Sequence, residues 1–256
     1  MNYYKLKISY AGQNYFGWQI QKETELTIQG LLEKALRAAT GIKKLKTVGS
    51  GRTDAGVHAL GQTVLVEMKE ELPEAAFLKG VNQQLPSDIK ILDVKKVNNS
   101  FHPIFSAKEK TYQYMISKKS LSPFLSNYFL EYQKPINVEL LQKGASFFVG
   151  EHDFKNYFCV GTEVNSTIRE MFSVNVVEKK DFTFVGDQVS GDFVCLEFRG
   201  TGFLKQQVRL MVGALLALNE GRVKLEDIQL SLSGPKNKHL APVVTGVGLY
   251  LVEVSY

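Results

Sequence analysis

The feature that most constrains the fold is a change of hydrophobic period along the first hundred residues. Between residues 4 and 10, apolar or aromatic side chains alternate with polar ones, the two-residue period of a strand with one buried face. Residues 28–39 instead carry apolar side chains at helical spacing, with Thr27 placed as an N-cap and Gly41 as a left-handed C-cap. The same patterns predict, in chain order, a strand at 43–48, a strand at 63–68, a helix at 75–85 and a strand at 89–97. The predicted order is therefore β-α-β-β-α-β.

The second half alternates in the same way, but less regularly. The pattern predicts strands at 111–117, 173–177, 193–198 and 248–254, and helices at 138–148, 204–219 and 225–232. Runs of strands with interspersed helices favour an α+β fold with antiparallel sheets. We therefore predict two similar halves, residues 1–103 and 104–256, each an antiparallel sheet flanked by helices, with a cleft between them.

Composition narrows the class of protein without deciding it. The net charge of +5 and the pI of about 9.0 suggest an anionic partner, although 31 basic against 26 acidic residues is a modest excess. Cys159 and Cys195 are too few for a disulfide framework and too far apart for a Cys-x-x-Cys motif, which fits a reducing cytoplasm. No segment approaches the roughly 20 apolar residues that span a bilayer, and residues 1–10 alternate like a strand rather than a signal peptide. We expect no membrane association.

Metal chemistry is not expected. The chain has four histidines, His58, His102, His152 and His239. None of them has a neighbouring His, Cys or carboxylate at the spacing of metal ligands. A structural or RNA-contacting role is the more natural interpretation of each.

The segment with the most chemical content is the polar, glycine-rich stretch at residues 49–59, between two apolar strands. It lacks the Gly-Lys-Ser/Thr of a P-loop and the spacing of a dinucleotide-binding fingerprint. Taken by its pattern alone, it is interpreted more readily as a turn than as an active site, because Gly, Asp and Ser gather at turns for backbone reasons.

Residues 51–59, Gly-Arg-Thr-Asp-Ala-Gly-Val-His-Ala, resemble the signature of the tRNA pseudouridine synthase A family. Further matches follow in the order of that family: Phe16-Gly17-Trp18-Gln19 with Gln21, Thr27-Ile28-Gln29-Gly30, Leu85-Pro86-Ser87-Asp88-Ile89, Phe105-Ser106-Ala107 with Tyr112 and Tyr114, Gly150-Glu151-His152-Asp153-Phe154, and Val208-Arg209 with Met211-Val212-Gly213. The resemblance thus extends over nearly the whole chain.

Two positions depart from the family pattern, which usually has arginine where this chain has Ile104 and Lys110. Lysine keeps the charge at position 110 but lacks the planar fork that grips a phosphate at two points, and Ile104 keeps neither. The grip on RNA in this region is therefore expected to be weaker or differently arranged.

The resemblance implies an isomerase that converts uridine to pseudouridine at positions 38, 39 and 40 of the tRNA anticodon stem-loop. It also implies a cytoplasmic homodimer that needs no cofactor and no metal. The cleft between the halves would bind RNA, with the N-terminal half carrying the catalytic loop and the C-terminal half completing the active site.

Asp54 is the catalytic carboxylate that the resemblance implies. The reaction requires an anionic group near the sugar C1′, and an aspartate with an ordinary pKa of about 3.9 is ionised at neutral pH. The sequence leaves three roles open for Asp54: it could attack C1′, attack the uracil ring or remove the C2′ proton. Without the resemblance, Asp54 is interpreted as closing an Asx-turn before Gly56.

The remaining site residues also follow from the resemblance. Tyr112 matches the tyrosine that stacks on the target base, and Arg209 matches the arginine that pairs with the catalytic aspartate. Arg52 resembles a residue that helps to hold the base out of the stack, while His58 and Lys110 are predicted to contact the substrate. Two of these residues also have a purely structural interpretation. Tyr112 could pack in the core, and Arg209 could lie along an apolar helix face.

Three other functions compete with this hypothesis. A non-catalytic RNA-binding protein would share the basic charge but would not turn over substrate. A related pseudouridine synthase would act on other RNA sites. A glycoside hydrolase also uses carboxylates at an anomeric carbon, but it normally needs a second one as general acid, and the motif offers none.

Overall fold

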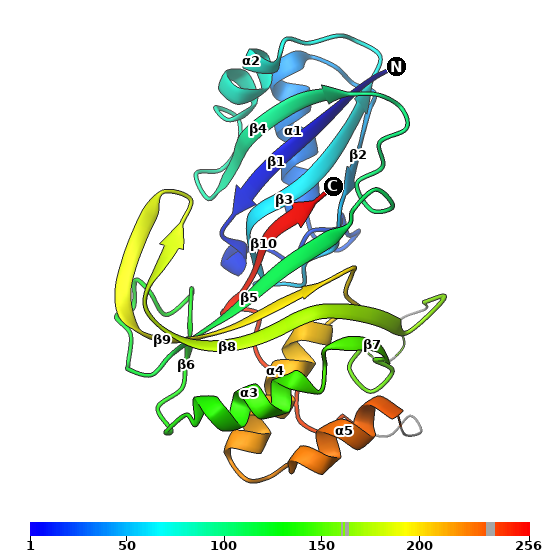
Figure 1. The fold of residues 1–256 in the computed structure, drawn as a ribbon. Coiled ribbons are helices and arrows are strands. Elements are labelled where there is room, and N and C mark those ends of the chain that lie inside the picture. The colour runs from blue at the N-terminus through cyan, green and yellow to red at the C-terminus, as the bar shows by residue number, and fades with distance from the viewer. Residues whose placement is uncertain (160, 162–163, 234–238) are drawn as a thin grey trace. The chain divides into compact units, whose positions relative to one another are not determined.

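The computed structural model describes residues 1–159, 161, 164–233 and 239–256 of the chain. The chain forms two compact units (Figure 1). The first contains residues Met1–Lys108 together with Leu251–Tyr256, and the second contains Glu109–Tyr250. Each unit has a largely antiparallel sheet and helices, which confirms the predicted α+β class. Within the described ranges, every helix is too short or too polar to cross a membrane.

The first unit follows the predicted β-α-β-β-α-β order. Its elements are β1 (Asn2–Tyr10), η1 (Gly12–Asn14), α1 (Ile28–Thr40), β2 (Leu45–Gly49), β3 (His58–Met68), α2 (Glu74–Ala76), η2 (Phe77–Val81) and β4 (Ile89–Val97), and β10 (Leu249–Ser255) joins it from Leu251 onward. The strands lie in the order β4-β1-β3-β10, and β2 also pairs with β3. The helices α1 and α2 cover one face of this sheet (Figure 1).

Side-chain alternation decides which face of β1 is buried. Tyr4, Leu6 and Ile8 are at most 1% exposed, whereas Lys7 on the opposite face is exposed. The helix packed on this sheet has both predicted caps. The Thr27 hydroxyl accepts a hydrogen bond from the Gly30 N–H at 3.3 Å, and Gly41 ends α1 in the left-handed conformation with φ of 71°.

The predicted helix at 75–85 is wrong in its extent. Only α2 is α-helical, and it continues into η2, a single π-helical turn that buries both Phe77 and Val81. Asn82 caps this turn, and its side-chain amide donates to the Ile91 C=O at 2.9 Å and accepts from the Ile91 N–H at 2.8 Å. Side chains that bond to a neighbouring strand in this way compete with helix continuation.

The second unit contains the remaining elements. They are β5 (Glu109–Ser117), β6 (Leu130–Glu131), α3 (Val138–Ser146), β7 (Gly150–Asp153), β8 (Ile168–Phe184), β9 (Asp187–Gly200), α4 (Gln207–Asn219) and α5 (Leu225–Ser233). The strands lie in the order β5-β9-β8-β7, with a two-residue parallel pairing of β6 to β5. The helices α3, α4 and α5 lie on one face of this sheet (Figure 1).

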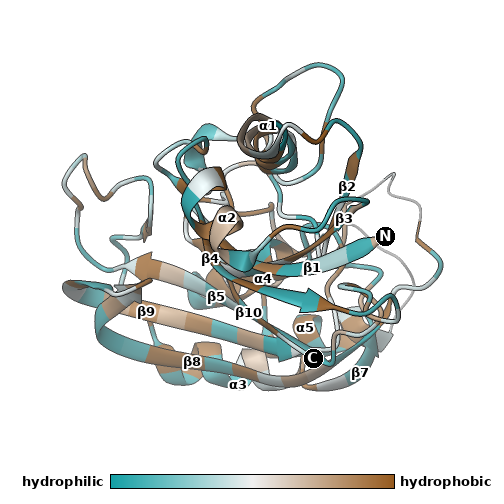
Figure 2. Cartoon of the chain, turned by 90° about the horizontal axis from the view of Figure 1, so that it is seen from above, coloured by the Kyte–Doolittle hydropathy of each residue, from teal (hydrophilic) through white to brown (hydrophobic). Residues whose placement is uncertain are grey.

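The hairpin of β8 and β9 is much longer than the predicted strands at 173–177 and 193–198. Hydrophilic and hydrophobic segments alternate along both strands (Figure 2), so their apolar runs underestimate their length. A cluster of aromatic rings supports the far part of the hairpin. Phe129 stacks on Phe193 with ring centroids 4.6 Å apart and meets Phe182 edge-on at 5.8 Å.

Helix α4 is buried around nearly its whole circumference rather than on one apolar face. All of its residues except Arg209 and Asn219 are buried. The close packing around it depends on a glycine of α3, because a Cβ on Gly144 would lie 2.6 Å from Leu218 Cδ2. A helix enclosed in this way provides a rigid base for the residues at its ends.

The edge of β8 is completed by a side chain instead of a strand. β7 pairs with β8 only from Ile168 to Met171. Further along β8, the side chain of Gln142 on α3 forms hydrogen bonds with the strand backbone. Its amide donates to the Val174 C=O at 3.1 Å and accepts from the Val176 N–H at 2.7 Å. Both valines are nearly fully buried, so these backbone groups need a partner.

Replacing Gln142 with methionine keeps the volume of the side chain but removes both hydrogen bonds. We expect the free energy of unfolding to fall by about 1–3 kcal/mol, because a buried N–H and C=O lose their partner. Urea denaturation measures this change. Gln188→Met, at an exposed position of the same hairpin, should change stability by less than about 0.5 kcal/mol. Equal effects of the two substitutions would contradict the role given to Gln142.

Candidate active site

Asp54 lies in the connection between β2 and β3, residues 50–57, which we call the Asp54 loop. The two strands pair in an antiparallel register from Leu45 opposite Met68 to Gly49 opposite Val64. The Val57 N–H donates to the Asp54 C=O at 3.2 Å and so closes the turn before β3. Asp54 is half-buried, with buried neighbours at Thr53 and Val57. The loop is therefore anchored on both sides of a residue that is itself half-buried.

Buried polar contacts fix the base of the Asp54 loop. Gln62 on β3 is 0% exposed, and its amide accepts from the Ser50 hydroxyl at 2.5 Å and donates to the Gly51 C=O at 2.8 Å. The Tyr10 hydroxyl lies 2.9 Å from the Thr53 hydroxyl. Burial raises the pKa of Tyr10 well above its usual range, so this phenol stays protonated at physiological pH.

A second segment, residues 11–18, packs against the Asp54 loop, and we call it the support loop. Its backbone bonds on both sides of Asp54: the Trp18 N–H donates to the Thr53 C=O at 3.0 Å, and the Gly56 N–H donates to the Tyr15 C=O at 3.3 Å. The support loop therefore holds the backbone directly before Asp54 and two residues after it.

Glycine allows the support loop to approach so closely. A Cβ on Gly12 would lie 1.9 Å from the Val57 carbonyl oxygen, and one on Gly17 would lie 2.5 Å from the Thr53 carbonyl oxygen. Gly17 also has a φ of 90°, in the left-handed region that side chains disfavour. The Phe16-Gly17-Trp18-Gln19 motif of the sequence thus includes a glycine that the geometry of the Asp54 loop requires.

His58 is placed in the core at the start of β3, with 1% of its surface exposed. Its Nδ1 accepts a hydrogen bond from the Gly12 N–H at 3.1 Å, which joins the support loop to β3. Its predicted contact with a substrate stays a prediction. Arg52, by contrast, is exposed on the Asp54 loop.

The second unit brings Tyr112, Tyr114 and Arg209 into one corner. The Tyr112 ring on β5 is 7% exposed and meets Phe203 edge-on at 4.9 Å. The Tyr114 hydroxyl donates to the Thr245 C=O at 2.9 Å, and the Arg209 Nε donates to the neighbouring Val244 C=O at 2.8 Å. Burial raises the pKa of Tyr114, and the positive charge of Arg209 partly opposes that rise.

The backbone around Arg209 is specialised. Gln206, the residue before α4, has a φ of 65°, an uncommon conformation for a residue with a side chain. Within α4, a Cβ on Gly213 would lie 2.4 Å from the Pro242 carbonyl oxygen, so glycine lets the segment after Pro242 lie directly on the helix. This contact sets the position of the Val244 carbonyl that orients Arg209.

Lys110 lies at the start of β5 and is only 8% exposed. Burial lowers its pKa to about 8, and the nearby positive charge of Arg169 contributes to the shift. Lys110 and Tyr112 have the same side-chain direction on β5, because they are two residues apart on a strand. An arginine, with its higher pKa, would stay fully charged at this position.

The predicted site residues thus belong to different units: Asp54, Arg52 and His58 to the first, and Tyr112, Lys110 and Arg209 to the second. The grouping of Asp54 with Tyr112 and Arg209 stays a prediction. The supporting residues Ser50, Gln62 and Tyr15 were not singled out by sequence. In the part of the chain that the structure describes, no three His, Cys, Asp or Glu side chains gather as a metal site would require.

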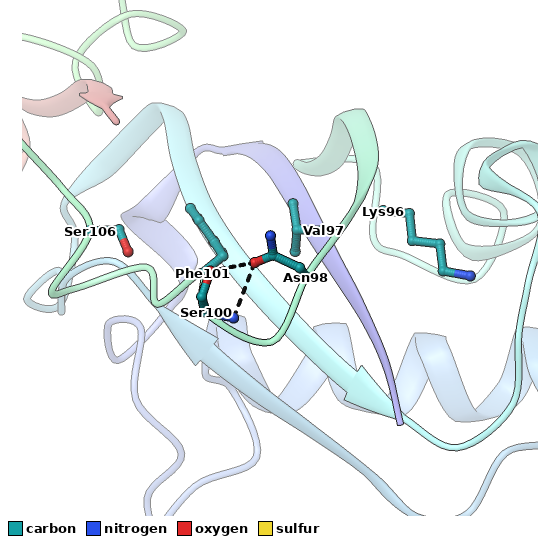
Figure 3. Close-up of a pocket in the computed structure, with 6 residues that line it drawn as sticks. All are labelled: Lys96, Val97, Asn98, Ser100, Phe101 and Ser106. Carbon is teal, nitrogen blue, oxygen red and sulfur yellow. Dashed lines mark hydrogen bonds between the residues drawn. The ribbon is translucent and has the colours of Figure 1, made fainter.

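A hollow of about 700 Å³ opens in the first unit beyond the end of β4 (Figure 3). It is lined by Lys96, Val97, Asn98, Ser100, Phe101 and Ser106. The Asn98 side-chain oxygen accepts two hydrogen bonds from Ser100, one from its backbone N–H at 3.1 Å and one from its side-chain hydroxyl at 2.6 Å. These bonds shape the turn after β4. None of the residues predicted for the site lines this hollow.

Gly17→Ala should destabilise the protein more than Gly41→Ala. Both glycines have positive φ, so alanine costs about 1–2 kcal/mol of backbone strain at either position. A Cβ on Gly41 would meet nothing within 4 Å, whereas one on Gly17 would clash with the Asp54 loop and add about 1–3 kcal/mol. Denaturant midpoints of the two variants measure the difference, and equal losses would argue against the close approach.

Comparison with known proteins shows the family to which the chain belongs. The family profile described as tRNA pseudouridine synthase matches residues 7–106 and 145–256. A protein named tRNA pseudouridine synthase A from Limosilactobacillus fermentum is 38% identical over 260 residues, covering 100% of this chain and 96% of its own. Its counterpart from Caldicellulosiruptor saccharolyticus is 36% identical and covers 98% of both chains. The tRNA pseudouridine synthase A 2 of Bacillus thuringiensis is 35% identical over the full length of both. The chain therefore belongs to the tRNA pseudouridine synthase family.

Proposed function

We propose that this protein isomerises uridine to pseudouridine in tRNA, at positions 38, 39 and 40 of the anticodon stem-loop. The observation that carries the proposal is the nine-residue segment 51–59, in which a half-buried Asp54 is held between buried neighbours. Membership of the tRNA pseudouridine synthase family supports the substrate class.

The reaction rearranges one nucleotide without oxidation or hydrolysis. The bond from uracil N1 to ribose C1′ breaks, the base turns, and C5 bonds to C1′. The C5 hydrogen leaves as a proton and N1 takes up a proton, so no atom is gained or lost. The protein has to supply an anion near C1′, a wall that retains the detached base, and exclusion of water. Asp54 supplies the anion, whether it attacks C1′, attacks the ring or removes the C2′ proton.

Residues of both units contribute to the proposed site. Tyr112 stacks on the target base, and its edge-on contact with Phe203 limits the freedom of its ring. Arg209 is proposed to pair with Asp54 and to offset the cost of burying the carboxylate when RNA excludes water. Arg52 and His58 assist substrate binding, Arg52 by helping to hold the nucleotide out of its stack. In this proposal the half predicted at residues 1–103 carries the catalytic loop, and the half predicted at residues 104–256 completes the site.

The assembly is proposed to be a cytoplasmic homodimer that binds the anticodon stem-loop and the body of the same tRNA. The net charge of +5 supports an extended, moderately basic RNA-binding surface rather than one dense patch. No cofactor takes part, because the isomerisation transfers no electrons and consumes no co-reactant.

Asp54→Asn should abolish turnover while tRNA affinity changes by less than about threefold, because the amide keeps the shape of the side chain but cannot act as an anion. Release of tritium from tRNA labelled at uridine C5 measures turnover, and filter binding measures affinity. The control is Asp93→Asn, which neutralises an exposed carboxylate on β4 of the same unit and should leave turnover unchanged.

The same assay separates the two main hypotheses. Wild-type activity in Asp54→Asn would end the assignment of the catalytic residue. Tight tRNA binding without tritium release from the wild-type protein would instead favour a non-catalytic RNA-binding protein.

The proposed contact of Lys110 with RNA makes a prediction about pH. Its pKa of about 8 leaves it mostly charged at pH 7 and mostly neutral at pH 9, so its attraction to phosphate weakens over this range. At constant ionic strength, wild-type affinity for tRNA should fall several-fold more between pH 7 and pH 9 than that of Lys110→Arg, which stays charged. Parallel pH profiles of the two proteins would contradict the contact.

A further inference from the structure

The support loop forms hydrogen bonds with the Asp54 loop and also with Asp88. The Asp88 carboxylate accepts a short hydrogen bond from the Tyr15 hydroxyl and another from the Asn14 amide at 3.3 Å, and its backbone C=O accepts from the Ala11 N–H at 2.9 Å. Asp88 thus holds residues 11, 14 and 15 of the support loop. Asp88 itself lies outside the support loop, 73 residues from Tyr15 in the sequence.

Asp88 itself sits on a rigid part of the first unit. It immediately precedes β4, whose first residue, Ile89, pairs with Tyr10 at the end of β1. Ile89 is buried, and its N–H donates to the Pro86 C=O at 3.0 Å. The carboxylate therefore has a fixed position relative to the sheet from which it can orient a neighbouring loop.

Tyr15 carries this constraint to the Asp54 loop. Its side-chain hydroxyl bonds to Asp88, while its backbone C=O accepts from the Gly56 N–H at 3.3 Å. The ring is 7% exposed, and burial, followed by the bond to Asp88, raises the pKa of its hydroxyl. The hydroxyl thus remains a donor throughout the physiological range. One residue connects the start of β4 to the turn that contains Asp54.

We propose that Asp88 is a positioning residue that fixes the Asp54 loop through Tyr15, without itself contacting the substrate. The inference rests on the proposed catalytic role of Asp54. Its physical basis is that small displacements of a catalytic group reduce the rate far more than they reduce substrate affinity.

Two substitutions remove the bond from opposite ends. Tyr15→Phe deletes the donor and Asp88→Ala deletes the acceptor. We expect either to lower kcat in tritium release by about 10- to 100-fold with KM changed by less than about threefold. The double variant should lose little more than Asp88→Ala alone, because Asp88→Ala already removes the acceptor of the Tyr15 hydroxyl. Asp88→Asn, which keeps an acceptor oxygen, should recover a large part of kcat.

Trp18 provides a readout that does not depend on activity. It is the single tryptophan of the chain, is 2% exposed, and donates its backbone N–H to Thr53 within the same loop pair. Loosening the support loop should expose the indole to water. Tyr15→Phe and Asp88→Ala should therefore shift its fluorescence emission to longer wavelength and increase quenching by acrylamide.

Tyr132→Phe is the matched control. The Tyr132 hydroxyl donates to a Glu220 carboxylate oxygen at 2.9 Å in the second unit, so this substitution removes the same kind of tyrosine–carboxylate bond. It should leave kcat and Trp18 fluorescence unchanged. Thermal unfolding of all variants shows whether each is folded at the assay temperature.

The outcomes separate this inference from the proposed function. If the wild-type protein releases no tritium, the proposed function fails, and the fluorescence comparison still tests the constraint on the loop. If the wild-type protein is active but Tyr15→Phe and Asp88→Ala match Tyr132→Phe in kcat and fluorescence, the positioning role is overturned. A loss confined to KM, or an Asp88→Asn variant as impaired as Asp88→Ala, would also overturn it.

Discussion

The structure of the first unit is organised around one constraint: the polar loop that carries the half-buried Asp54 has to be held in place between two strands. Polar groups that leave water need hydrogen-bond partners, and the base of the Asp54 loop finds them in Gln62 and Tyr10 rather than in regular secondary structure. The support loop satisfies the backbone on either side of Asp54, and it comes close enough because Gly17 has no side chain. Hydrogen bonds from two sides stiffen a loop that would otherwise be free to adopt several conformations.

The second unit solves a related problem with a helix. Enclosed α4 provides a fixed base, and Arg209 near its start is oriented by the carbonyl of Val244. Tyr112 and Tyr114 come from β5, where the two-residue period of a strand places both rings on the same side of the sheet. A left-handed Gln206 and the close approach at Gly213 accompany this arrangement, as expected where backbone conformation serves a site.

Local signals predicted much of the fold correctly. The caps at Thr27 and Gly41 and the strand at 89–97 follow from neighbouring residues alone, and the structure agrees with them. The helix at 75–85 was overestimated because Asn82 bonds to Ile91 of a strand that sequence patterns could not place beside it. The long hairpin was underestimated because rings from distant segments, such as Phe129, stabilise parts of it whose own pattern is mixed. For the site, the sequence identified the loop of Asp54 and its family, but it singled out neither Gln62 nor Tyr15.

The order of strands and helices in the first unit, the identity of the Asp54 loop and membership of the family were determined by the sequence alone, since each follows from local patterns and motifs. In the second unit the sequence patterns missed the short strands β6 and β7. Only the tertiary structure decided that His58 is a buried acceptor for Gly12 and that Asp88 binds Tyr15. The first contact joins two residues that are 46 positions apart in the sequence, and the second joins two that are 73 positions apart. Their geometry is set by the packing of β1, β3 and β4, and the chemistry of a residue does not specify which distant group it will meet until that packing exists.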